Sequence, residues 1–111
     1  MAPRTKPFPP LPNTLLVRIY VTESRARLQR VLVLLHESRR IKGLTAFRGV
    51  AGFGSAGSYF MEGDDPGDPP MVLEFFDDAD SADATVAFVT SLIAPHHIVV
   101  IPVTSLPLTP A

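Results

Sequence analysis

The sequence has no cysteine and no tryptophan among its 111 residues. Without cysteine the chain has no disulfides, no thiolate metal ligands and no cysteine nucleophile, which fits the cytoplasm. No apolar run reaches the ~18 residues of a membrane-spanning helix. Arg4, Lys6 and several prolines occupy the first positions, where a secretion signal would need an apolar core. We therefore expect a cytoplasmic protein.

The net charge is close to zero, but the basic and acidic residues lie in different parts of the sequence. The net charge is −1, which argues against general nucleic-acid binding. All ten Lys and Arg lie at or before Arg48, where Glu23 and Glu37 alone oppose them, so this part carries +8. The nine other acidic residues lie between Glu62 and Asp83. These charges can neutralise each other within one fold or between subunits, or they simply form a solvated basic helix and a solvated acidic loop.

Prolines and glycines divide the chain into segments. Five of the twelve prolines fall within residues 1–12, which excludes a helix or a central strand there. We predict a proline-rich arm over residues 1–13, one domain over residues 14–104 and a tail over residues 105–111. All seven glycines lie between Gly43 and Gly67, and the segment 52–68 has no periodicity, so it is predicted to be a long loop.

Hydrophobic patterns between these segments predict four strands and two helices. A helix is predicted from about Ser24 to Ile41, with Gly43 as its stop, because apolar residues recur there at three- and four-residue spacing. A second helix is predicted from the acidic residues after Asp77 to Pro95, which ends it. The four short apolar runs predicted as strands are Thr14–Val21, Leu44–Val50, Met71–Phe76 and Ile98–Val103.

This order of elements predicts an α+β fold. The sequence β-α-β-β-α-β is typical of a ferredoxin-like sandwich, with a four-stranded antiparallel sheet and two helices on one face. Ile98–Val103 is apolar at successive positions, so the other face of the sheet also needs a cover. A second copy of the chain is the simplest cover, and we predict a homo-oligomer.

Residues 43–54 resemble a segment of the PII-like signalling proteins. They read Gly43-Leu44-Thr45 and then Arg48-Gly49-Val50-Ala51-Gly52-Phe53-Gly54, similar to the RG-x-x-GFG pattern of the bacterial PII-like branch. The runs Leu15–Tyr20, Pro70–Asp78 and Ile98–Val103 resemble the first, third and last strands of that family. The resemblance covers nearly everything except the two ends.

The resemblance implies a regulatory homotrimer that binds an adenine nucleotide in clefts between subunits. A mobile T-loop would then report the ligand to a membrane transporter or a metabolic enzyme, and some members are linked to bicarbonate. The chain departs from the family at Ser55, where a basic residue is usual, and at Pro95-His96-His97, which replaces a glycine-rich phosphate loop with its lysine. AMP or ADP is therefore expected rather than ATP.

The same segment supplies the candidate ligand-binding residues. Glycine amides can cradle an anion, and a guanidinium can bind phosphate in a bidentate way. An aromatic ring can stack on a base, and a histidine can replace the missing lysine. The predicted ligand-binding residues are Arg48, Gly49, Gly52, Phe53, Gly54, Ser55 and His97. The predicted partner-binding residues of the loop are Ser58, Tyr59, Glu62, Asp64 and Asp65. The simpler interpretation is a glycine turn and a solvated loop.

Two other classes of protein share this fold. A trimer like the divalent-cation-tolerance proteins would bind metal, but His36, His96 and His97 have no metal-ligand spacing. A dimeric ferredoxin-like barrel enzyme would need a polar site on the open sheet face, for which only Arg18 and Glu74 are candidates. No catalytic triad, Walker loop or paired acids are apparent. We expect a binding protein rather than an enzyme, with no obligatory cofactor and no metal.

Overall fold

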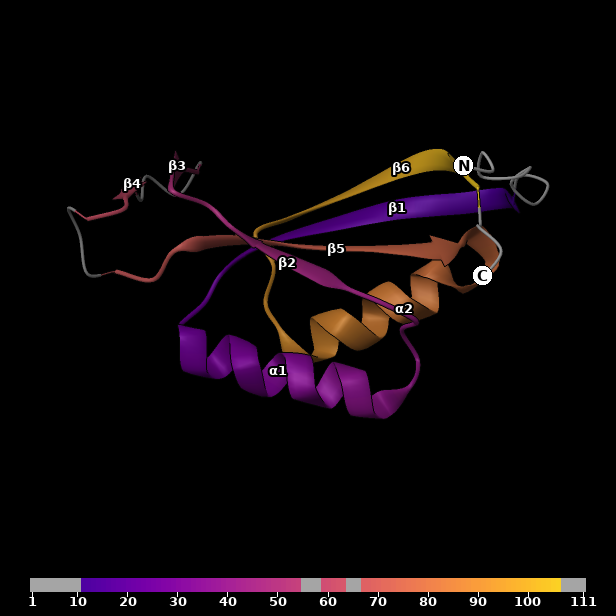
Figure 1. The fold of residues 1–111 in the computed structure, drawn as a ribbon, viewed down its shortest axis with the longest axis horizontal. Helices are drawn as coiled ribbons and strands as arrows, with labels where there is room; N and C mark the ends of the chain where they lie inside the picture. Colours follow the sequence, from indigo (N-terminus) through magenta and orange to yellow (C-terminus); the bar gives the residue numbers. More distant parts are fainter. Residues whose placement is uncertain (1–10, 55–58, 64–66, 107–111) are drawn as a thin grey trace, which may run out of the picture.

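The computed structural model describes residues 11–54, 59–63 and 67–106. Within them a four-stranded antiparallel sheet has the order β2-β5-β1-β6, and both helices lie on one of its faces (Figure 1). This arrangement confirms the predicted ferredoxin-like fold. The elements are β1 (Leu11–Thr22), α1 (Arg25–Ser38), β2 (Thr45–Arg48), β3 (Ala51–Phe53), β4 (Tyr59–Met61), β5 (Pro70–Asp78), α2 (Ala79–Leu92) and β6 (His97–Ser105).

Side chains that face the two helices form the core. Val17, Ile19 and Leu73 have no exposed surface, and they alternate along β1 and β5 with half-buried residues. From the helices, α1 adds Leu28, Val31 and Leu35, while α2 and its exit add Val89 and Ile93. This period-two burial is the pattern that the apolar strands predict. Neither helix of the described chain is long and apolar enough to cross a membrane.

Helix α1 begins where the sequence indicates but ends earlier. The Ser24 hydroxyl accepts a hydrogen bond from the backbone N–H of Arg27 at 3.2 Å and caps the first turn. At the other end, the Ser38 hydroxyl donates to the Leu35 carbonyl and accepts from the Arg40 N–H. Arg39 then takes a left-handed conformation with φ of 58°. The prediction that Gly43 ends the helix was wrong, because serine side-chain bonding terminates it at Ser38.

Helix α2 follows β5 without a loop. The Asp78 carboxylate accepts a hydrogen bond from the Ser81 N–H at 2.9 Å and caps the helix. The helix ends at Leu92, before the predicted stop at Pro95, and the Ile93 N–H still bonds the Val89 carbonyl. The element is therefore slightly shorter than predicted.

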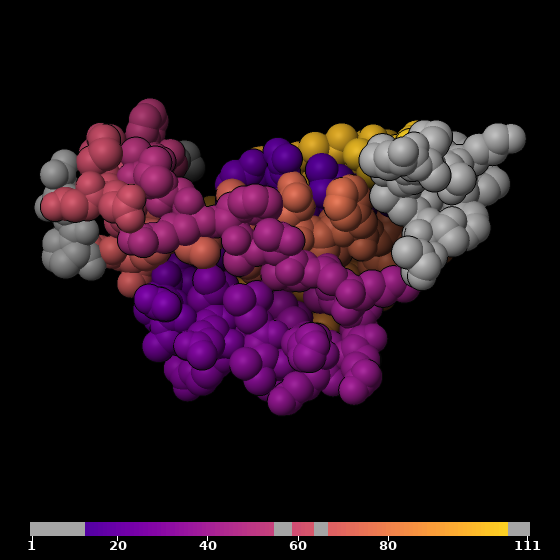
Figure 2. Space-filling view, in the orientation of Figure 1, coloured from indigo at the N-terminus to yellow at the C-terminus, as the bar shows by residue number. Residues whose placement is uncertain are grey.

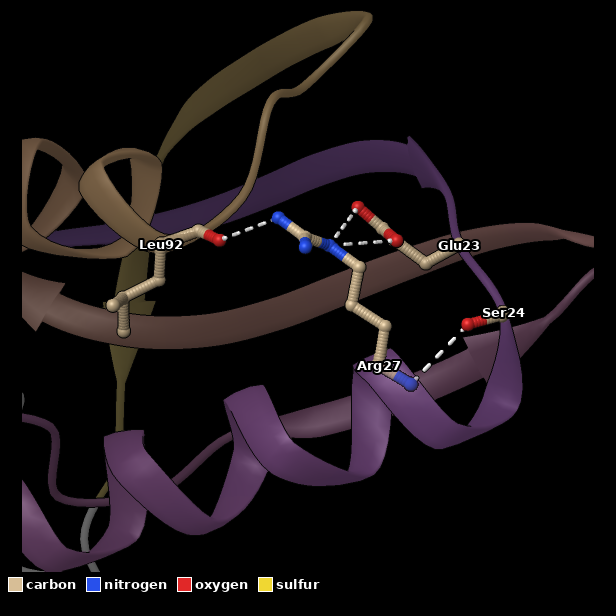
Figure 3. A network of polar contacts seen from close by, with 4 residues as sticks. All are labelled: Glu23, Ser24, Arg27 and Leu92. Carbon is tan, nitrogen blue, oxygen red and sulfur yellow. Dashed lines mark hydrogen bonds and ion pairs between the residues drawn. The ribbon is translucent and has the colours of Figure 1, made fainter.

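Arg27 joins the start of α1 to the end of α2 (Figure 3). Its Nη2 lies 3.5 Å from the Leu92 carbonyl oxygen, and its Nε pairs with the Glu23 carboxylate at 3.1 Å. At the other end of α1, the Arg40 guanidinium lies 5.0 Å from the centre of the Phe88 ring. Cationic side chains near both ends of α1 thus contact the second half of α2.

The start of β1 corrects another prediction. Leu11 and Pro12 were assigned to an arm outside the sheet, yet β1 begins at Leu11 and pairs with β6 there. The register shifts between Leu11 and Thr14, and Asn13 has a positive φ of 53°. This irregularity explains how Pro12 fits in a central strand. At a bulge the regular hydrogen-bond ladder is interrupted, so the N–H that proline lacks is not needed.

No helix or strand of the described residues covers the second face of the sheet. Along β1 and β5 it presents Leu16, Arg18, Tyr20, Val72, Glu74 and Phe76. Phe47 from β2 and Val99 and Ile101 from β6 belong to the same face by register. The polar residues Thr45 and His97 lie at the two edges of this same face. We call the other nine residues the open sheet face.

Candidate functional site

The glycine-rich segment leaves the sheet as a projecting hairpin, residues 49–69. Strand β2 ends at Arg48, and β3 then pairs with β4 through Ala51–Met61, Gly52–Phe60 and Phe53–Tyr59. Figure 2 shows the hairpin as a lobe at one end of the molecule. The prediction of an irregular loop from Gly52 onward was therefore wrong for β3 and β4. The missed signal is Phe60, which is buried between exposed Tyr59 and Met61.

Gly49 lies where the hairpin leaves the sheet, a place that we call the root of the hairpin. Its N–H donates to the Pro70 carbonyl at 2.7 Å, so the two ends of the hairpin are tied together. A Cβ at this position would lie 2.8 Å from Pro70 Cγ and 3.2 Å from Pro70 O. At Gly52 the nearest such contact is 3.8 Å, and at Gly54 nothing lies within 4 Å. Of these three glycines, only Gly49 is required by close packing, and its amide is already bonded rather than free to cradle an anion.

Arg48 lies beside the root with its side chain exposed. Its Nη1 is 3.1 Å from the Glu62 carboxylate, and the Glu62 N–H donates to the Val50 carbonyl at 2.8 Å. An exposed pair of this kind contributes little stability, so an incoming phosphate can replace the carboxylate. Glu62, predicted as a partner-binding residue, lies against Arg48, a predicted ligand-binding one.

Two aromatic rings stand out on the hairpin. Phe53 is 80% exposed and Tyr59 is 60% exposed, and their rings stack with centroids 6.5 Å apart and 21° between planes. Stacked aromatic residues at this exposure are available to a nucleobase or to a partner protein. The other loop residues predicted to bind, Ser55, Ser58, Asp64 and Asp65, lie outside the described residues.

His97 lies on the opposite edge of the sheet from Arg48. It pairs with Tyr20 across β6 and β1, Tyr20 pairs with Val72, and Val72 pairs with Phe47 next to Arg48. Three strand spacings of about 4.8 Å separate the two edges, or roughly 14 Å. The ring of His97 lies 6.0 Å from that of Tyr20. A single chain therefore does not bring His97 together with Arg48, which sequence reasoning grouped in one site.

Two hollows on the surface of the described residues lie away from Arg48. One of about 240 Å³ is lined by Leu32, Leu35, His36, Ile41 and Leu44, and another follows the outer side of α1. Neither touches a predicted ligand-binding residue. In the described part of the chain no three His, Asp or Glu side chains gather as metal ligands, and His96 bonds Thr22 Oγ1 through Nε2 at 3.0 Å.

Arg18 and Glu74, the polar pair considered for an enzyme, lie at the centre of the open sheet face. Arg18 Nε is 2.8 Å from Glu74 Oε1. The hydrogen bond and charge of Glu74 raise the pKa of Arg18 above its usual value. Each group is thus satisfied by the other, and the pair has the character of an ion pair rather than of an acid and a base.

Comparison with known protein families shows which family the chain resembles. The family described as DUF190, Uncharacterized ACR, COG1993, matches residues 14–105. No curated protein matches the chain. The matched residues include the whole helical layer, the projecting hairpin and nearly all of the four-stranded sheet.

Proposed function

The chain belongs to the DUF190 family, a PII-like family, and from this premise we propose that it is a regulatory protein that binds AMP or ADP at the root of its projecting hairpin. The carrying observation is the position of Arg48 and Gly49. They join a strand of the sheet to a hairpin that extends beyond it. A ligand bound there acts where the two ends of the hairpin meet the sheet, and can change the direction of the hairpin.

The ligand site is proposed to lie between subunits of a homotrimer. Arg48 and His97 are on opposite edges of the sheet, one residue apart in level, because His97 aligns with Phe47, the neighbour of Arg48. When the β2 edge of one subunit meets the β6 edge of the next, both residues lie at that junction. Arg48 leaves its strand on the helix side and His97 on the open side, so the long Arg48 side chain would reach around the edge to a ligand beside His97. The open sheet face supports the assembly, because Phe76, Ile101 and their apolar neighbours need a cover.

The charges of the chain favour a nucleotide with one or two phosphate groups. No Lys or Arg follows Arg48, so the hairpin and β6 add no permanent cation to the site. One guanidinium and one histidine can balance a monophosphate or diphosphate better than a triphosphate. Bicarbonate, a small anion, is a possible second ligand at the same donors.

The exposed aromatic pair is proposed to report the bound state. Ligand that displaces Glu62 from Arg48 would free β4 from one of its ties to the root. Phe53 and Tyr59 would then change their orientation toward a transporter or a metabolic enzyme. This is a shift between two positions of the hairpin, which ligand biases by its differential affinity.

Calorimetric titration with AMP, ADP, ATP and cyclic AMP, with and without bicarbonate, tests this proposal on protein of measured mass. We expect AMP or ADP to bind the trimer, and Arg48→Ala to weaken binding at least about tenfold through loss of a charge-assisted contact. Glu62→Gln is the matched control, because it removes the ion pair and keeps the guanidinium. We expect it to bind as tightly as the wild type or more tightly.

Three outcomes would contradict the proposal. If no nucleotide produced binding heat, the proposed nucleotide ligand would be wrong. Equal weakening by Arg48→Ala and Glu62→Gln would show that Arg48 acts only through its ion pair. A dimeric mass without binding would favour the barrel class instead.

A further inference from the structure

Helix α1 carries a second set of apolar residues on its outer side. Its buried residues Leu28, Val31 and Leu35 face the sheet, whereas Val33 is 49% exposed and Leu34 is 50% exposed. An open hollow of about 510 Å³ follows this side, lined by Ala26, Gln29, Arg30, Val33 and Leu34. In Figure 1 the helix is the outermost element of its layer, on the side away from the open sheet face.

The outer residues have the spacing of a helix–helix seam. Ala26, Arg30, Val33 and Glu37 follow each other at intervals of four, three and four residues. Such intervals keep residues on one side of a helix and are typical of pairs of packed helices. We call these four residues, together with Leu34, the outer seam.

The two charges of the outer seam are symmetrically placed. Arg30 and Glu37 are seven residues apart, about 10.5 Å along the helix, and their midpoint lies between Val33 and Leu34. Both are exposed, and neither takes part in an ion pair with another described residue. A two-fold axis through the midpoint brings Arg30 level with Glu37 of an antiparallel second helix, and Val33 level with Leu34.

We propose that the outer seam is an interface with a second copy of this chain, in which two α1 helices pack antiparallel. Each contact then occurs twice, as in every two-fold interface, so two Arg30–Glu37 pairs flank a centre of Val33 and Leu34. One charge of each sign favours this occupant. An anionic membrane or a strongly charged partner would instead be matched by a seam of a single sign.

The interface is expected to be weak and reversible. A single helix face provides less than the roughly 800 Å² per partner of a standard stable interface. It lies on the opposite side of the molecule from the open sheet face, so the two contacts do not compete. Several copies of the seam on one oligomer would strengthen the association by multivalency.

Sedimentation velocity of the full chain over a range of concentrations tests the inference. We expect the wild type to form larger species as concentration rises. Arg30→Glu and Glu37→Arg should each weaken this association at least about tenfold, because one substitution places like charges at both symmetric contacts. The double variant Arg30→Glu/Glu37→Arg should return to within about threefold of the wild type.

A control and an independent readout separate this contact from other effects. Arg25→Glu makes the same charge change on the flank of the helix and should leave association unchanged, and circular dichroism verifies the fold of each variant. A mass that does not depend on concentration would overturn the inference, as would a double variant as weak as the single ones. If the mass did not depend on concentration but the protein floated with phosphatidylglycerol vesicles, the outer seam would instead be a membrane-binding surface. Nucleotide titration of the same variants tests the proposed function separately.

Discussion

The two faces of the sheet differ more in cover than in apolar character. On the helix side, Ile19 and Leu73 are fully buried under α1 and α2. On the other side, Phe76 is 56% exposed. It is one of the apolar residues that surround the Arg18–Glu74 ion pair at the centre of the open sheet face. An ordinary solvent-facing sheet alternates polar with apolar residues. The open sheet face therefore has the composition of an interface, with one ion pair that can fix the register of a second copy.

The largest expected difference concerns Leu73 and Val72, which are neighbours in β5 on opposite faces. Leu73→Ala should lower the free energy of unfolding by about 2–5 kcal/mol, because it leaves a cavity in a fully buried site. Val72→Ala should cost less than about 1.5 kcal/mol in dilute protein. Urea unfolding at several protein concentrations measures both. Equal costs in dilute protein would contradict the distinction between the faces.

The next prediction tests what covers the open sheet face. Phe76→Lys should lower the mass in solution toward that of the monomer, because a lysine ammonium cannot be buried without a partner. Light scattering after size-exclusion chromatography measures this. Ala84→Lys adds the same charge on an exposed position of α2 and should keep the wild-type mass. A wild type that is itself monomeric would show that no second copy covers the face.

The sequence was sufficient for the fold because its signals were local. Strand alternation and helical spacing predicted both layers, and the order of elements fixed the topology. Three features were missed because they depend on specific hydrogen bonds or packing: the Ser38 bonds that end α1, the bulge that admits Pro12, and the β3–β4 pairing under Phe60. Short elements of this kind carry too few residues to show a period.

The candidate site was less predictable than the fold. The chemistry of single residues, such as the exposed guanidinium of Arg48, can be inferred from sequence. Two facts could not be inferred from the sequence. The Gly49 N–H donates to the Pro70 carbonyl, and His97 lies on the edge of the sheet opposite Arg48. Both follow from strand register, which is set by the whole sheet rather than by a motif.

The smallest expected effect lies at Asp78, where the chain passes from β5 into the helical layer. Hydrogen bonds from the Ser81 hydroxyl and backbone N–H hold the pKa of this carboxyl below its ordinary value of 3.8. A folded pKa below the unfolded one contributes stability that is present above about pH 3.8 and is lost as pH falls through the folded value. Asp78→Asn retains an N-cap acceptor that does not titrate. Thermal unfolding between pH 5 and pH 2 should therefore show a slightly steeper loss of Tm in the wild type than in the variant. Because Asp78 is exposed, the difference should be small, and parallel pH profiles would show that the cap carries no charge dependence.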